Sequence, residues 1–292
     1  MAKKAPLFFL LSVLLLIGSL TVAHAQESVG ETVRVTTTEG NILIGVIEQQ
    51  NEERMIIRVK DIGEVTIQRS NISNIEVIHP DRIRNGSYWF ENPHGTRYFF
   101  APNAIGLRKG SGYYQNAWIF FNNVNYGVSN NFSIGAGLIP GFLFGGGLDA
   151  TPLWILPKLS IPVSGDNFHL GVGAMIGGVV GSGSGALFYG SGTVGSTDKT
   201  LTIGLGYGAS GGDISSTPLV NISGMYRAKR TIYMLGELYF LPGIDGSGLT
   251  LLGARWAPEN FAVDFGLILP LADTGGFISI PWLGVSIPFG NR

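Results

Sequence analysis

Five charged residues occur inside runs that otherwise alternate between bulky apolar and small residues. In each run the charge falls on the face opposite the bulky side chains, and a period of two assigns the two faces to opposite sides of a strand. If the bulky face meets lipid, an Arg or Lys on that face would cost about 2–4 kcal/mol at mid-membrane. We therefore expect all five to face the inside of a barrel. They are Lys158, Arg227, Glu237, Arg255 and Asp264.

Two kinds of lumen fit these charges. A salt-bridged cluster would fill and close a narrow barrel, whereas a charged constriction would select the solutes that pass. Arg255 and Asp264 flank a tight turn at diagonal positions, within reach of one another across the hairpin. Arg227 and Arg255 are expected near the same end of neighbouring strands. Asp264 and Glu237 are the expected counter-charges, and Lys158 reaches the others only across the lumen.

Catalytic chemistry has little support in this chain. Of its four His residues, only His169 lies in an alternating run, and it follows a tight turn directly. A lumen histidine bonded by its neighbours explains that position better than a catalytic one. The chain has no Cys, which excludes a disulfide, a thiolate nucleophile and a Cys-based metal site. We expect no catalytic residue, no cofactor and no metal.

The elements that would position these charges are short strands with strict alternation, from about residue 113 to residue 289. In residues 201–208, Leu, Ile, Leu and Tyr share one face, whereas Thr and three Gly share the other. Residues 168–176 and 261–269 repeat the pattern. So many strands with no helix to cover them indicate that lipid is the apolar partner, as in a transmembrane β-barrel.

The sequence predicts about twelve strands. The connections between them alternate between tight polar turns, expected in the periplasm, and longer Gly-rich loops, expected outside. The tight turns are at residues 129–131, 164–166, 197–199, 228–230 and 257–259. The longer loops include residues 103–112, 141–152, 210–217 and 242–247. The predicted strands are residues 96–101, 114–128, 132–139, 153–163, 167–180, 185–195, 200–209, 218–227, 231–241, 248–256, 260–270 and 277–289.

Composition and targeting agree with this class. Lys3 and Lys4, an apolar run at residues 7–20 and Ala23-His24-Ala25 predict a secretory signal peptide over residues 1–25. Charged residues make up 13% of the chain, against about 25% in a soluble domain. The chain also contains 44 Gly residues. The formal net charge of −1 gives no signal for binding a polyanion, so nucleic acid is not an expected partner.

Residues 26–78 differ from the rest because charges are frequent and the strands are those of a soluble domain. The predicted strands lie at 32–36, 42–48, 55–60 and 64–68, and the segment 70–77 closes a small bent-sheet barrel. A Val-x-Val strand, a Gly turn and a strand bent at Gly45 resemble the Sm-like and SH3-like small barrels. The loops that bind RNA in Sm proteins are not reproduced, so RNA binding is not implied. Residues 79–95 are a predicted linker.

From residue 96 to the end the chain resembles uncharacterised outer-membrane barrel proteins of diderm bacteria. The resemblance implies the fold and the location, with no defined activity and no catalytic residues. The stretches that carry it are Arg97-Tyr98-Phe99-Phe100-Ala101-Pro102-Asn103-Ala104, Lys109-Gly110, Tyr113-Tyr114-Gln115-Asn116 and Tyr126-Gly127-Val128-Ser129-Asn130-Asn131-Phe132-Ser133-Ile134-Gly135.

The sequence thus predicts an all-β protein: a small soluble β-barrel domain in the periplasm, followed by an antiparallel outer-membrane barrel over residues 96–292. The expected function is non-enzymatic, either a narrow passive channel for small solutes or a closed structural barrel. Its expected partners are membrane lipid and small solutes. The alternative is a membrane-anchored module that binds a periplasmic protein or the cell wall through residues 26–78. The remote alternative is an outer-membrane lipid hydrolase, which needs His and Ser near the outer rim.

Overall fold

The chain forms two compact units, Met1–Trp89 and Phe90–Arg292. The structure is a computed structural model that describes residues 28–84, 87–165, 167–241, 248–271 and 279–290. The expected signal peptide lies outside the described residues. The expected linker, residues 79–95, is divided between the two units. Within the described residues, no helix is long and apolar enough to cross a membrane.

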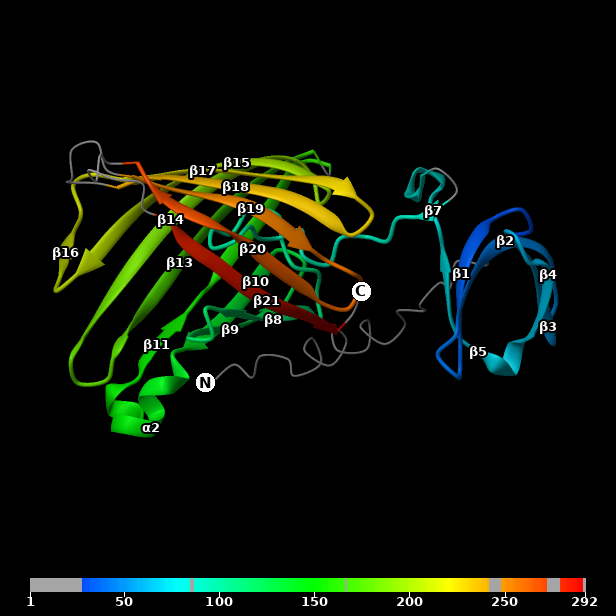
Figure 1. Cartoon of the computed structure of the whole chain (residues 1–292), viewed down its shortest axis with the longest axis horizontal. Helices are drawn as coiled ribbons and strands as arrows, with labels where there is room; N and C mark the ends of the chain where they lie inside the picture. Colours follow the sequence, from blue (N-terminus) through cyan, green and yellow to red (C-terminus); the bar gives the residue numbers. More distant parts are fainter. Residues whose placement is uncertain (1–27, 85–86, 166, 242–247, 272–278, 291–292) are drawn as a thin grey trace, which may run out of the picture. The chain divides into compact units, whose positions relative to one another are not determined.

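The second unit is a closed antiparallel barrel of twelve strands (Figure 1). Each strand pairs with its neighbour along the chain, and the ring closes because β8 pairs with β21 as well as with β9. Segments β11 and β12 both pair with β10 and β13, so they form one interrupted strand. The strands are β8 (Ser111–Ala117), β9 (Phe121–Gly127), β10 (Phe132–Leu138), β11 (Pro152–Ile155), β12 (Lys158–Ser164), β13 (Phe168–Val179), β14 (Gly183–Ser196), β15 (Lys199–Ser210), β17 (Leu219–Lys229), β18 (Ile232–Phe240), β19 (Gly248–Trp256), β20 (Ala262–Pro270) and β21 (Ile280–Gly290).

The predicted all-β barrel is confirmed, but two of the predicted strands are wrong. Residues 96–101 form no strand; they make a turn inside the barrel, with one isolated bridge between Arg97 and Pro102. Residues 114–128, predicted as one strand, belong to the hairpin β8–β9, which turns at residues 118–120. The two errors cancel in the strand count. Residues 103–112 are consequently not one of the longer outer loops. Lys109 N–H donates to Asn130 Oδ1, which belongs to the tight β9–β10 turn.

Alternation of the two strand faces is plain in β15. Leu201, Ile203 and Leu205 are exposed by 51%, 55% and 49%, whereas Thr200 and Thr202 on the opposite face are buried. The other strands likewise expose a band of large apolar side chains, which lipid would cover. Members of this band on other strands include Val124, Ile134, Ile161, Leu170, Val172, Phe188, Tyr207, Ile222, Tyr226, Met234, Leu252, Trp256, Phe265, Leu267, Leu283 and Ile287.

The two ends of the barrel differ in their connections. The short β9–β10, β12–β13, β14–β15, β17–β18 and β19–β20 connections lie at one end, called the turn end below. The opposite end, called the loop end, has short turns between β8 and β9 and between β13 and β14, and it also carries longer excursions. Between β10 and β11 lie three short helices, and β16 (Asp213–Ile214) pairs with the end of β15. The helices are η3 (Pro140–Phe142), α2 (Leu143–Gly146) and η4 (Leu148–Ala150).

The first unit contains a five-stranded antiparallel sheet in the order β4-β3-β2-β1-β5. Among the described residues no pairing joins its edge strands β4 and β5, so the sheet is open and the expected closed small barrel is not seen. Gly45 lies where β2 crosses β3 so closely that a Cβ would be 2.6 Å from Arg58 O. The elements are β1 (Thr32–Thr37), β2 (Ile42–Gln50), β3 (Arg54–Val59), β4 (Gly63–Gln68), η1 (Arg69–Asn71), β5 (Ile72–Val77), η2 (Pro80–Arg82), β6 (Ile83–Arg84) and β7 (Ser87–Tyr88).

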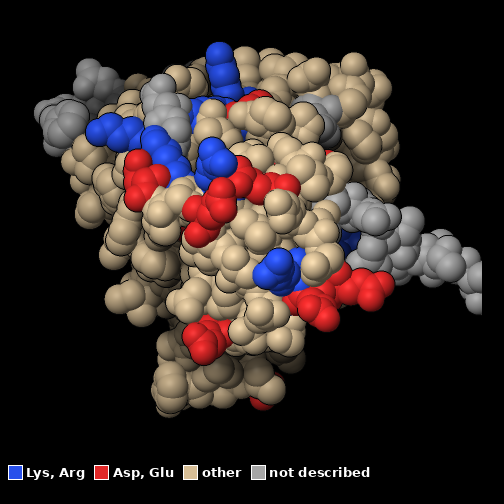
Figure 2. All heavy atoms as spheres, turned by 90° about the vertical axis from the view of Figure 1, so that its right-hand side faces the viewer, with Lys and Arg blue, Asp and Glu red and all other residues tan. Residues whose placement is uncertain are grey.

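The sheet of the first unit has its own apolar core on one face. The core consists of Val33, Val35, Ile47, Met55, Ile57, Val59 and Ile67. On the surface, Arg58 pairs with Glu48 at 2.6 Å and with Glu64 at 3.6 Å. Figure 2, viewed from the side on which β3 and β4 lie in Figure 1, shows the two signs of charge interspersed. No single sign dominates that face.

The outward band yields the first test. Replacing Ile203 by Arg places a charge near the middle of β15 on its exposed face, and should lower the free energy of unfolding by about 2–4 kcal/mol in bilayers. Denaturant titration of tryptophan fluorescence in phospholipid vesicles measures it. The control is Ile62→Arg, at a turn residue of the first unit that is 69% exposed. Equal stability of the two variants would show that β15 does not face lipid.

Candidate functional site

Residues 90–107, called the plug below, precede the first barrel strand and lie inside the ring of strands (Figure 1). The plug forms hydrogen bonds with residues on strands all around the ring, including Thr193 on β14, Glu237 on β18 and Ser286 on β21. A segment that contacts so many strands must occupy the lumen. Its buried residues are Phe90, Asn92, His94, Gly95, Arg97, Tyr98, Phe99, Ala101, Asn103, Ala104, Ile105 and Leu107.

The centre of the site is a buried three-residue ion cluster. Arg255 on β19 and Asp264 on β20 are direct register partners. Arg255 Nε and Nη2 donate to Asp264 Oδ1 and Oδ2 at 2.5 and 3.0 Å. Arg97 of the plug donates to Asp264 Oδ2 at 2.9 Å. All three side chains are at most 3% exposed, so the carboxylate is shared by two guanidinium groups away from water.

Arg255 also binds the backbone of the plug. Its Nη1 donates to the carbonyls of His94 and Arg97 at 3.0 and 3.3 Å, and its Nη2 donates to the carbonyl of Tyr98 at 2.7 Å. A planar guanidinium can serve several acceptors in fixed directions, which a Lys ammonium cannot reproduce. Arg255 therefore fastens the turn of the plug to the barrel wall.

Glu237 on β18 binds the next residues of the plug. Its Oε1 accepts from the backbone N–H groups of Phe100 and Ala101 at 2.9 and 3.2 Å, and its Oε2 accepts from Tyr239 Oη at 2.6 Å. The carboxylate is 1% exposed. Peptide N–H groups and a phenol compensate its charge in place of the cation that the sequence predicted.

Lys158, on β12, binds the far end of the plug. Its ammonium donates to the carbonyls of Asn103 and Ile105 at 2.9 and 2.7 Å. Asn103 shapes this turn, because its Nδ2 donates to Gly95 O and its Oδ1 accepts from Ile105 N–H. Lys158 does not reach the other lumen charges. Two carbonyls of an irregular backbone satisfy it.

Arg227, on β17, binds the beginning of the plug. It pairs with Asp198 at 3.0 Å and donates to Phe90 O at 2.8 Å, and its guanidinium lies over the rings of Phe90 and Tyr233. Asp198 comes from the β14–β15 turn. The sequence analysis expected Asp264 or Glu237 as the counter-charge of Arg227, and for Arg227 this prediction is wrong. Its acid belongs to a turn that the sequence analysis treated only as a connection.

All five predicted lumen charges are buried, and each binds the plug directly or pairs with a residue that does. The residues that sequence reasoning missed are those of the plug itself, above all His94, Arg97 and Tyr98. Tyr98 Oη bonds to Thr200 and Thr202 on β15. The signal available in the sequence was an Arg within an apolar run that lacks sustained alternation. If such an Arg is buried, it needs an acidic partner.

A Ser–His contact occurs in the site, but it is sealed. Ser286 Oγ lies 3.0 Å from His94 Nδ1, and Arg97 Nη2 also donates to that hydroxyl. Ser286 and His94 are 0% and 1% exposed, so no substrate reaches the hydroxyl in this state. His169, the other histidine considered, lies at the start of β13 opposite Thr193, at the turn end. Neither position lies at the loop end of the barrel.

Comparison with known proteins gives only distant structural likeness. No family model and no curated protein matches the chain. It is similar to the solved structure "KdgM porin" with a TM-score of 0.46 and 10% identity over 61% of this chain and 99% of the other. "NanC porin structure in rhombohedral crystal form" gives 0.39 and 10%, over 63% and 98%. "Outer-membrane expressed OmpT of Vibrio cholerae" gives 0.31 and 13%, over 89% and 95%. At these values the likeness carries no argument, and the barrel rests on its own strand pairing.

The plug contacts predict the effect of one substitution. Arg255→Ala removes the donors of three plug carbonyls and one partner of Asp264, and breaking a buried pair of this kind costs about 3–5 kcal/mol. Backbone amides of residues 94–104 should lose hydrogen-exchange protection, measured by mass spectrometry. Lys229→Ala, an exposed cation at the same end, is the control. Unchanged protection in Arg255→Ala would mean that the plug is held by other contacts.

Proposed function

We propose that this chain is a non-enzymatic outer-membrane β-barrel whose lumen is closed at the turn end by its own plug. The observation that carries the proposal is the set of five inward charges bound to one irregular segment inside the ring. Of the two functions expected from sequence, the closed barrel fits this arrangement directly. Small solutes would pass only when the plug leaves its position.

The membrane assignment rests on the two faces of the barrel. The outer face carries the exposed apolar band, whereas Lys158, Arg227, Glu237, Arg255 and Asp264 all lie on the inner face. A soluble protein rarely exposes apolar patches beyond a few hundred Å². A closed barrel leaves no unpaired strand edge, which hydrocarbon requires.

The orientation that we propose places the turn end in the periplasm. Bacterial outer-membrane barrels have short periplasmic turns and longer extracellular loops. Both the first strand, β8, and the last, β21, have their outer chain ends at the turn end. The first unit, which joins the plug at residue 90, would then lie in the periplasm.

Conductance in planar bilayers tests the closed barrel. The chain has no Cys, so a disulfide can be added cleanly. A Cβ on Gly171 of β13 would lie 3.2 Å from the Cβ of Ala104 in the plug. Disulfides have a Cβ–Cβ distance of about 3.5–4.5 Å, so the plug must shift by a few tenths of an ångström for the bond to form. We expect little conductance from wild type and more from Arg255→Ala. Adding Gly171→Cys and Ala104→Cys to Arg255→Ala should silence it until a reductant is added.

The control carries Arg255→Ala with Ala104→Cys alone, which should conduct with or without reductant. A large steady conductance from the wild-type protein, unchanged by the oxidised disulfide, would contradict the proposal. That outcome would favour an open channel whose solute pathway passes beside the plug.

The second candidate is a binding module in the first unit, with the barrel as its anchor. The compact separate unit and the open sheet edges β4 and β5 support it, because an unpaired edge can accept a further strand. Strand order and the Gly45 bend also support an Sm-like relationship for this unit. Deleting residues 26–78 should leave the barrel and its conductance behaviour unchanged while abolishing capture of a periplasmic protein or cell-wall partner. Conductance that changes strongly on deletion would tie the unit to gating.

A further inference from the structure

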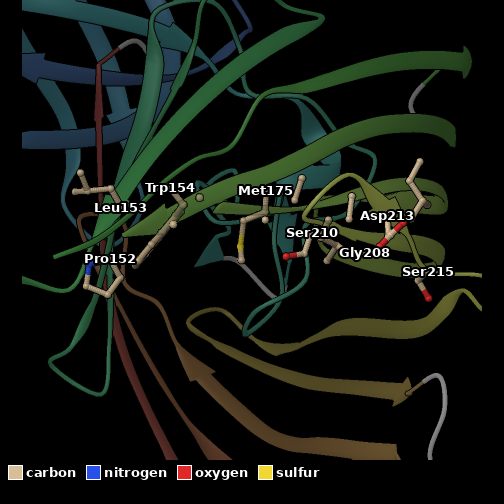
Figure 3. Close-up of a pocket in the computed structure, with 15 residues that line it drawn as sticks. Pro152, Leu153, Trp154, Met175, Gly208, Ser210, Asp213 and Ser215 are labelled. Atoms are coloured by element: carbon tan, nitrogen blue, oxygen red, sulfur yellow. The ribbon is translucent and has the colours of Figure 1, made fainter. Parts of the chain in front are cut away.

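The loop-end half of the lumen is open on one side, whereas the plug fills the turn-end half. A cavity of about 640 Å³ lies against β11, β13, β14, β15 and β16, and is called the vestibule below (Figure 3). Met175, Leu187 and Gly208 are register partners across three neighbouring strands and face it together. Trp154 closes one side, and Ser210 and Asp213 lie at the other.

The vestibule is apolar, although barrel lumens are ordinarily polar. Its large inward side chains are Trp154, Met175 and Leu187, and the positions between them are mostly Gly. The indole N–H of Trp154 is already bound, since it donates to Asn123 Oδ1. The ring of Trp154 therefore offers apolar surface to the cavity.

Aromatic rings continue from the vestibule toward the plug. Successive ring centroids lie 6.3, 6.3, 5.1 and 6.0 Å apart. The row runs through Trp154, Phe121, Trp118, Trp282 and Phe99, and the last of these belongs to the plug. Trp154 thus links the lining of the vestibule to the packed rings that reach the plug, although none of the lining residues belongs to the plug itself.

The charge around the vestibule is negative. Asp213 is the charged residue in its lining, and Asp149 lies in the helical excursion between β10 and β11. Among the described loop-end connections no Lys or Arg occurs. The described cations of the barrel lie at the turn end or bind the plug. An anion would therefore meet no positive charge at the loop-end opening of the vestibule.

We propose that the vestibule binds a small molecule with a compact apolar body and a positively charged group. Pockets for small molecules are mostly apolar, with volumes of about 300–1,000 Å³ and a few polar groups that fix orientation. Trp154, Met175 and Leu187 bury the apolar body, while Asp213 attracts the cation at the rim. The plug stops the ligand, so it is bound and not transported. The side from which it arrives rests on the proposed orientation.

Calorimetry with charged probes of one shape tests this site. 1-Aminoadamantane and 1-adamantanecarboxylate share a compact cage and differ in charge. With the full chain in lipid nanodiscs, and empty nanodiscs subtracted, the amine should bind saturably, and the carboxylate at least fivefold more weakly. Nanodiscs expose both faces of the barrel, so the result does not depend on orientation or on conductance. If the proposed closed barrel is wrong, the conductance recording in planar bilayers will show it, whereas the calorimetry tests only the binding site.

Two glycines provide a matched pair of variants. Gly208 faces the vestibule and has no atom within 4 Å of an added Cβ, so Gly208→Phe should fill the cavity and abolish binding of the amine. Gly190 lies on the outer face, between its register partners Val172 and Leu205, with its nearest atom at 4.0 Å. Gly190→Phe should therefore bind the amine as wild type does.

Asp213→Asn should remove most of the preference for amine over carboxylate. The proposal is overturned if wild type shows no saturable binding of the amine beyond empty nanodiscs. It is also overturned if Gly208→Phe binds as tightly as Gly190→Phe, or if the carboxylate binds as well as the amine.

Discussion

The guanidinium of Arg255 is the group on which the filled half of the lumen depends. A buried ion pair is stable only when its remaining donors are satisfied, because desolvation otherwise exceeds the Coulombic gain. Asp264 takes two of its bonds, and three plug carbonyls take the others. Strand carbonyls already accept the bonds of the ladder. The irregular segment inside the barrel supplies further carbonyls at the positions that the guanidinium of Arg255 reaches.

The dependence runs in both directions. The plug has no ladder of its own, so its backbone groups need partners wherever water is excluded. Lys158 supplies donors to two of its carbonyls, and Glu237 supplies acceptors to two of its N–H groups. Each charge would be costly alone in the lumen, and each plug group would be costly unpaired. Groups of the plug, more than the other charged side chains, therefore compensate the charges on the inner face of the strands.

Alternation predicted which face each charge occupies, because a single strand determines it. The Arg255–Asp264 pair was predicted because one hairpin carries both residues, and the structure confirms it. The acid that pairs with Arg227 was not predicted, because Asp198 belongs to the β14–β15 turn and not to a strand. The hairpin β8–β9 was missed because its turn carries Trp118 and Ile119 at positive φ, where turn residues such as Gly or Asn are usual. Residues 96–101 have the apolar and aromatic composition of a strand, but side chains of the barrel wall, and not a neighbouring strand, bind the N–H groups of Phe100 and Ala101 and the carbonyl of Tyr98.

The two halves of the lumen differ in charge as well as in filling. Around the plug, the buried cations Arg97, Lys158, Arg227 and Arg255 outnumber the acids Asp198, Glu237 and Asp264 by four to three. The mouth at the loop end carries Asp149 and Asp213. In a lumen with low-dielectric walls such a difference acts over a longer range than in water. A cation is drawn toward the mouth and repelled by the plug region, so the same charge distribution that admits it to the vestibule opposes its passage. This difference in charge is consistent with the proposed binding of a cation at the vestibule and opposes its passage toward the plug.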